Sequence, residues 1–234
     1  MIQNGSPTQN GSAKSLGALR TFARERPPVE RCDLCGVDLA PDHQHLFAPA
    51  NRQLACACAA CAILFGGAAQ QKYRLVPRRV RHFVNFHQAD SDWDALLIPV
   101  GMAFFFHSSV AGRVMAYYPS PAGATESLLD FETWAELERD NPVLGEMEPD
   151  VEALLVNRLQ GARDYYIAPI DTCYELVGLI RVHWRGLSGG EVVWNEIGKF
   201  FTKLQEAAQP VGAAGELRLE QESRDETGGE DNRA

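Results

Sequence analysis

Residues 31–65 read RCDLCGVDLAPDHQHLFAPANRQLACACAACAILF and hold five of the chain's six cysteines and two of its six histidines. In a reducing compartment such a cluster indicates metal binding rather than disulfides. A module this small has too little core to fold on its own, and a bound metal can supply the missing stability. This stretch therefore decides how the N-terminal part of the chain folds.

Two CxxC pairs, Cys32/Cys35 and Cys58/Cys61, are separated by 22 residues. Each pair turns two thiolates toward one ion, and two pairs complete the tetrahedral sulfur site that zinc accepts. Gly36 follows the first pair, where the backbone needs a positive φ. The intervening residues predict a hairpin with its tip at residues 48–51. We therefore expect a zinc-ribbon-like module over residues 29–65 with these four cysteines as ligands.

Three further residues in the same stretch are possible alternative ligands: Cys56, His43 and His45. Cys56 can replace Cys58, since the two are separated by one residue and would share a strand face, as would the two histidines. A mixed site and a second ion both stay open, beside the simpler interpretation of each histidine as a hairpin residue. Zinc is the expected metal, and iron or an iron–sulfur cluster is the alternative that four thiolates also permit.

The chain's 234 residues, 45% of them hydrophobic, suffice for one sizeable core and a small satellite module. No apolar run approaches the roughly 20 residues of a membrane helix. The first residues lack the apolar core of a secretory signal. We therefore expect a cytoplasmic protein without membrane insertion.

The remaining sequence predicts an α+β fold, with the metal module followed by a mixed α/β body and disordered termini. Residues 1–14 are expected to be disordered, 15–28 to form a short helix and linker, 71–212 the body, and 213–234 a disordered acidic tail. Within the body the patterns predict strands at 73–83 (broken at Pro77), 94–108 (a strand pair, or one strand bent at residues 99–101), 112–123 and 164–170. Helices are predicted within 127–142 and at 149–159, 173–184 and 190–205, with Asp171 or Thr172 capping the third.

Charge is unevenly distributed along this chain of net charge −9. Residues 71–82 carry five basic residues and no acid, whereas residues 90–164 carry 14 acids and four basic residues. The basic segment can bind nucleic acid or a protein partner, or it can pair with the chain's own carboxylates, which is the simpler interpretation. The acidic body opposes binding of a polyanion.

No catalytic constellation emerges from the other residues. Cys173 stands at the start of a predicted helix, where its pKa could be lowered, but His183 is about three turns away and is too distant to act as its base. A buried, inert Cys173 is the preferred interpretation, and an enzyme that uses this thiol is the more distant alternative.

Seven segments of the chain resemble an uncharacterised bacterial family of actinobacterial type that is associated with operons for nickel–iron hydrogenases. The resemblance covers most of residues 30–200 and implies an accessory role in assembly, maturation or electron transfer, without catalytic residues to assign. The segments are CDLCGVDLAPDHQHL, LACACAACAILF, YRLVPRR, IPVGMAFFF, YPSPAGATESLL, PDVEALLVNR and CYELVGLIRVHWRGLSGGEVVW.

Three hypotheses follow. The chain is a zinc-binding accessory protein whose partner is a hydrogenase subunit or another accessory factor, an iron-binding electron-transfer protein, or a zinc-ribbon regulator that binds nucleic acid. We expect the first.

Overall fold

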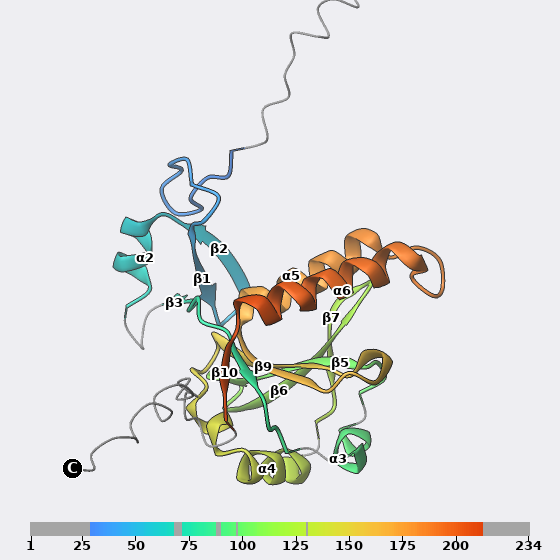
Figure 1. Cartoon of the computed structure of the whole chain (residues 1–234). Coiled ribbons are helices and arrows are strands. Elements are labelled where there is room, and N and C mark those ends of the chain that lie inside the picture. Colours follow the sequence, from blue (N-terminus) through green and yellow to red (C-terminus); the bar gives the residue numbers. More distant parts are fainter. Residues whose placement is uncertain (1–28, 68–71, 88–89, 97, 130, 213–234) are drawn as a thin grey trace, which may run out of the picture.

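The computed structural model describes residues 29–67, 72–87, 90–96, 98–129 and 131–212 (Figure 1). The fold is α+β, as predicted, with a three-stranded sheet in the cysteine-rich module and a seven-stranded sheet in the body. The expected disordered terminus, the helix at 15–28 and the acidic tail lie outside the described residues. Of the helices in the described part, none is long and apolar enough to cross a membrane.

The small sheet has the order β2-β1-β3 and is built on the predicted hairpin. β1 (Gln44–Ala48) pairs with β2 (Gln53–Ala57), and β3 (Arg74–Leu75) joins the other side of β1. The turn closes where Arg52 N donates to Ala48 O at 2.8 Å, with Arg52 at a φ of 56°. A short helix, α2 (Ala59–Phe65), follows β2 directly.

The large sheet has the order β10-β4-β9-β8-β5-β6-β7, and every neighbouring pair is antiparallel except the parallel pair β10–β4. Its strands are β4 (Arg81–Phe83), β5 (Met102–Ser108), β6 (Arg113–Ser120), β7 (Gly123–Ser127), β8 (Glu152–Asn157), β9 (Asp164–Pro169) and β10 (Gln209–Val211).

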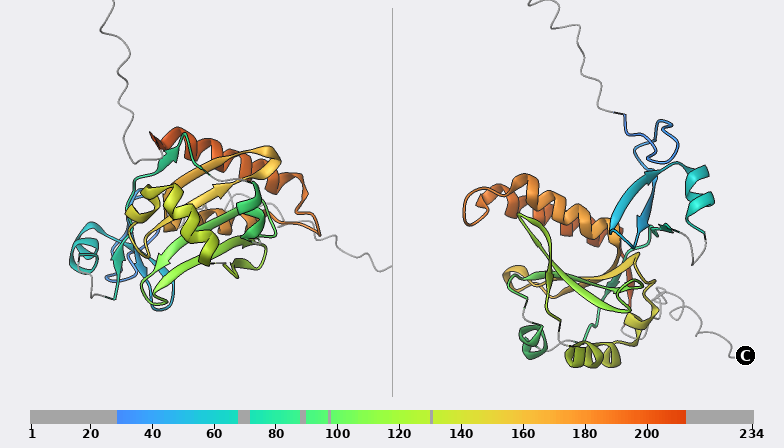
Figure 2. Two further views of the ribbon diagram at one scale, coloured as in Figure 1. Left: turned by 90° about the horizontal axis from the view of Figure 1, so that it is seen from below. Right: turned by 180° about the vertical axis from the view of Figure 1, so that it is seen from behind.

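Helices cover both faces of the large sheet, which makes a three-layer body (Figures 1 and 2). Phe104 and Phe106 lie in the core that also contains α5 (Ile170–His183) and α6 (Gly190–Ala207). Phe105 lies in the opposite core, with α3 (Asp90–Ala95), α4 (Phe131–Asp140) and the 3-10 turn at Pro142–Glu146. Successive strand residues face opposite sides of the sheet, and helices cover both sides, so all three phenylalanines are buried.

One predicted element is wrong, and two others differ from the prediction in where they begin or how they are capped. The helix predicted at 149–159 is strand β8, whose residues are all buried. A central strand that is covered on both faces is apolar throughout, and such a run also satisfies a helical spacing. The predicted strand at 94–108 begins only at β5, since α3 occupies Asp90–Ala95. The third helix, α5, has Pro169 as its N-cap, without a side-chain cap.

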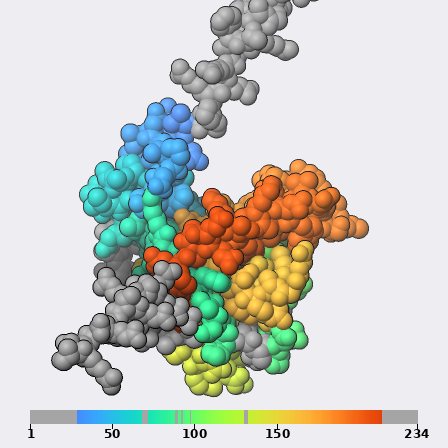
Figure 3. All heavy atoms as spheres, viewed as in Figure 1, coloured from blue at the N-terminus to red at the C-terminus, as the bar shows by residue number. Residues whose placement is uncertain are grey.

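The module and the body share part of their core. Phe47, on β1, is 1% exposed and belongs to the same apolar cluster as the buried faces of α5 and α6. Pro77 divides the predicted strand at 73–83 as expected, so that β3 completes the small sheet and β4 joins the large one. In Figure 3 the module forms a lobe that projects from the body. Its hairpin is thus held to the body by packing as well as by the chain.

Candidate metal centre

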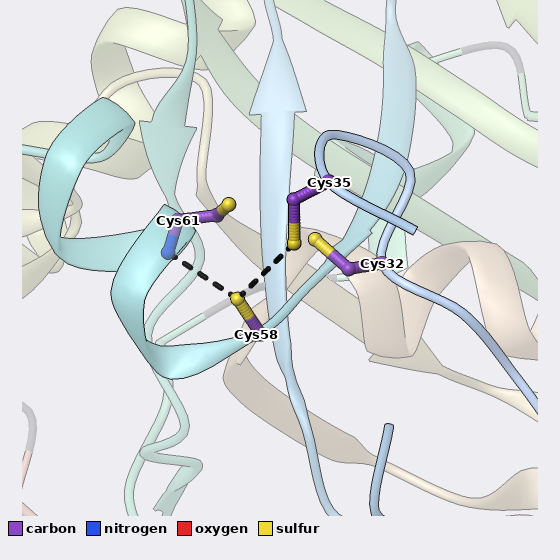
Figure 4. Close-up of side chains that lie close together, drawn as sticks. All are labelled: Cys32, Cys35, Cys58 and Cys61. Carbon is purple, nitrogen blue, oxygen red and sulfur yellow. Dashed lines mark hydrogen bonds between the residues drawn. The ribbon is translucent and has the colours of Figure 1, made fainter. Parts of the chain in front are cut away.

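Four cysteines gather at one end of the module: Cys32, Cys35, Cys58 and Cys61 (Figure 4). Their sulfurs all lie within 4.8 Å of one another. A tetrahedral zinc site with bonds of about 2.3 Å places its sulfurs about 3.8 Å apart. Cys35 Sγ and Cys58 Sγ, which come from the two different pairs, are 3.8 Å apart. The group can therefore hold a metal ion without large movement of the chain.

The first pair sits in a tight backbone turn. Gly36 N donates to Cys32 O at 2.8 Å, and Cys32 N donates to Val37 O at 2.9 Å. Gly36 has a φ of 75°, which confirms the positive φ predicted for it. Arg31 and Asp38 close the turn with a β-bridge and an ion pair of 3.1 Å. The turn brings the thiols of Cys32 and Cys35 close to each other.

The second pair lies at the start of a helix. Strand β2 ends at Ala57, and Cys58 is the N-cap of α2, where its sulfur accepts from Cys61 N at 3.5 Å. Cys61 then lies in the first turn of α2 and is 7% exposed. The module therefore consists of a cysteine turn, a hairpin and a helix, whereas a ribbon would place the second pair in another turn between strands.

The environments of the four thiols differ. Burial opposes ionisation of Cys32, but backbone amides at Cys58 and Leu34 outweigh it and lower the pKa of Cys32 to about 6. Burial, together with the neighbouring thiols, raises the pKa of Cys61 to about 12. Only thiolates bind metal, so loading this site must release protons, the proton of Cys61 among them.

The three alternative ligands form a second group. His43, His45 and Cys56 offer ligand atoms that also lie within 4.8 Å of one another. The sequence suggested that Cys56 and Cys58 share a strand face. They do not, because β2 ends between them. Cys56 faces the histidines, whereas Cys58 turns to the other cysteines. The structure thus separates the two halves of the CAC motif.

One residue next to this second group, Asp171, was not predicted from the sequence to lie there. Asp171 Oδ2, in the first turn of α5, lies 2.7 Å from His45 Nδ1, although 126 residues separate the two in the chain. The sequence marked Asp171 only as a possible helix cap. No local signal relates the two residues, because they meet only when the hairpin packs against α5.

Cys173 is completely buried, and burial raises the pKa of its thiol. It belongs to the core beneath α5 and has no exposed surface from which to attack a substrate. His183 is at the far end of the same helix. These positions agree with the interpretation of Cys173 as an inert core residue.

The body also has an open groove of ≈ 480 Å³ between α6 and the β8–β9 loop. Asn157 and Asp164, at its rim, already pair with each other at 2.9 Å, and Trp194 and Phe201 line its α6 side. Neither of the candidate ligand groups lies in it. Both candidate ligand groups found among the described residues therefore lie in the module.

Comparisons with known proteins agree with the resemblance at the level of an uncharacterised family. No curated protein and no solved structure matches the chain. Residues 31–208 match a family of unknown function, DUF5947, and this range contains both candidate ligand groups and every strand of the large sheet except β10. The chain therefore belongs to the family of unknown function DUF5947.

Proposed function

We propose that the protein is a zinc-stabilised accessory protein whose cysteine module docks a protein partner. The observation on which this rests is the four-cysteine group together with the helix that it anchors. The core around the group is small: Cys32, Leu46, Ala57, Cys61 and Ala62. A bound ion that joins the first turn, β2 and α2 would supply stability that so few apolar residues cannot. Four thiolates leave no open position, as in structural zinc sites.

The docking surface is the outer side of α2. Ile63, Leu64 and Phe65 are 79%, 67% and 41% exposed, and α2 has no acidic residue in its first turn and no basic residue in its last. Consecutive large apolar side chains in water mark interaction sites. Leu75, 40% exposed, lies on the strand next to this helix. The metal would hold α2 in place, so that metal binding and partner binding are coupled.

The resemblance makes a nickel–iron hydrogenase subunit, or another accessory factor of that enzyme, the first partner to test. Leu64→Asp should abolish co-purification with that partner and leave the metal content unchanged. Leu187→Asp is the matched control, since Leu187 is fully exposed in the α5–α6 loop, away from the module. Equal loss of the partner in both variants, or in neither, would contradict docking through α2.

Elemental analysis of the protein purified without added metal or chelator tests the zinc. Tightly held zinc that requires all four cysteines supports the structural role. Iron in place of zinc would favour an electron-transfer function. One observation supports this second candidate function: Cys35 is exposed, so one ligand residue would be accessible to a redox partner. A visible absorption that disappears on reduction would identify that case.

The nucleic-acid hypothesis receives less support. The arginines of the basic segment pair with carboxylates of the chain itself: Arg74 with Asp150, Arg78 with Asp42, Arg79 with Glu148 and Glu152, and Arg81 with Glu146. Little positive charge is left to attract phosphates. A salt-sensitive mobility shift with DNA or RNA would restore this hypothesis.

A further inference from the structure

Three donor groups meet on one face of the β1–β2 hairpin. His45 and Cys56 are directly opposite each other in the ladder, and His43 precedes His45 by two residues. The two imidazole rings meet edge to face, with their centroids 4.9 Å apart. The ligand atoms of all three residues lie within 4.8 Å of one another. Two imidazoles and a thiolate form a donor set that suits zinc and its neighbours in the first transition row.

Each histidine has one ring nitrogen engaged and one directed elsewhere. His43 Nδ1 lies 2.9 Å from Ala40 O, and His45 Nδ1 lies 2.7 Å from Asp171 Oδ2. The side chain of His43 is only 7% exposed, and its Nε2 is buried without a hydrogen-bond partner among the described residues. Burial of a polar atom without a hydrogen-bond partner is unfavourable, so the position of this nitrogen requires an explanation. A metal ion would supply the missing partner.

Asp171 orients His45 as a supporting carboxylate does in metal sites. Its Oδ2 binds His45 Nδ1, and its Oδ1 accepts from Thr172 N at 2.7 Å, so the carboxylate is fixed at both oxygens. Metal-binding histidines almost always donate their second ring N–H to such a group, which fixes the tautomer that leaves Nε2 free. The contact thus prepares His45 Nε2 to bind an ion.

The surroundings of the group are predominantly acidic. Glu30 Oε2 lies 3.5 Å from His43 Nδ1, and Asp33 Oδ2 accepts from Cys56 N at 2.6 Å. Arg78 is the opposing charge near His45, and it pairs with Asp42 at 2.8 Å. The carboxylates favour a cation over a neutral ligand at this position.

We propose that His43 Nε2, His45 Nε2 and Cys56 Sγ form a second metal site, for Zn²⁺, that is separate from the four-cysteine group. Three protein ligands leave the fourth tetrahedral position open to water or to a side chain of a partner, as in catalytic and exchangeable zinc sites. The site lies where the hairpin contacts α5, so an ion there would also join the module to the body through Asp171.

The test is a metal titration of the full-length chain after metal removal, with Co²⁺ as the spectroscopic substitute and Zn²⁺ in competition with a chromophoric chelator. The wild type should bind two equivalents, of which the weaker belongs to the open site. His43→Gln and Cys56→Ser should each lose that weaker equivalent and retain the thiolate-to-cobalt absorption of the four-cysteine site. This retained absorption shows that the module is still folded in the variants.

Asp171→Asn keeps all three ligands and should weaken the second equivalent by about 10–100-fold, as the loss of a supporting carboxylate does. His107→Gln is the matched control. His107 also faces a carboxylate, at 3.7 Å from Glu138, with a side chain 30% exposed against 33% for His45, and it belongs to neither ligand group. The His107→Gln variant should bind both equivalents of metal, as the wild type does.

Two results would overturn the second site. In the first, the wild type binds a single equivalent of metal, and His43→Gln and Cys56→Ser still bind that equivalent. The other is a single equivalent lost equally in Cys56→Ser and Cys58→Ser, which would indicate one mixed site and would refute the separate four-cysteine centre as well. Loss of the second equivalent alone leaves the structural zinc intact, so failures of the two proposals are distinguishable.

Discussion

Truncation of Phe47 tests whether the metal module and the body unfold as one unit. Phe47 is 1% exposed and packs into the core formed with α5 and α6. Burial of a phenylalanine removes about 150–250 Å² from water. At about 25 cal/mol per Å², this corresponds to about 4–6 kcal/mol as an upper bound. Because alanine retains Cβ, Phe47→Ala should lower the free energy of unfolding by about 3–5 kcal/mol.

The assay is denaturant unfolding of the zinc-loaded chain, followed by circular dichroism and, in parallel, by release of zinc to a chromophoric chelator. Both signals should shift together to lower denaturant in Phe47→Ala. The thermal midpoint should fall by about 6–20 °C, given about 2–4 °C per kcal/mol for a chain of this size. Phe65→Ala is the control, since Phe65 is 41% exposed, and it should change stability by no more than about 0.5 kcal/mol.

One result would refute this reasoning. If Phe47→Ala released zinc at lower denaturant but left the circular-dichroism transition of the body unchanged, the module would fold independently. The packing of the hairpin against α5 would then contribute nothing to the stability of the body.

Three further predictions concern the cysteine centre, a buried carboxylate and a half-buried histidine. Cys61→Ser should abolish metal binding by the four-cysteine group and unfold residues 29–65, detected by metal analysis and proteolysis, whereas Cys56→Ser should retain metal binding by that group. Glu152→Gln should lower the free energy of unfolding by about 1.5–3 kcal/mol, because this fully buried carboxylate accepts a charged hydrogen bond of 2.8 Å from Arg79. Glu148→Gln removes the half-exposed partner of the same arginine and should lower the free energy of unfolding by less than about 1 kcal/mol. Burial lowers the pKa of His82 in the folded chain. The unfolded chain therefore binds more protons below about pH 6.5, and stability should fall as pH drops through that value, less steeply in His82→Gln.

Contrary outcomes are equally definite. Zinc retained by Cys61→Ser would remove that residue from the ligand set. Equal losses of stability in Glu152→Gln and Glu148→Gln would show that burial of the carboxylate adds nothing. An unchanged pH slope in His82→Gln would show that other groups account for the acid sensitivity.

The metal module was largely predictable from local sequence. The spacing of the two CxxC pairs, the glycine after the first pair and the hairpin tip all depend on residues of one short segment, from Cys32 to Cys61. The structure has the four cysteines together, Gly36 at a positive φ and the turn in place. The amphipathic face of α6 was predictable for the same reason, since Val193, Ile197 and Leu204 are buried at helical spacing.

What only the tertiary structure decided is how these elements meet. β8 was mistaken for a helix because its apolar character comes from helices that cover the sheet on both sides. The division of Cys56 from Cys58 depends on where β2 stops and α2 begins. The contact of His45 with Asp171 joins residues 126 positions apart. Local periodicity reports which way a side chain points within its own element, whereas its neighbours are set by packing between elements that are distant in the chain.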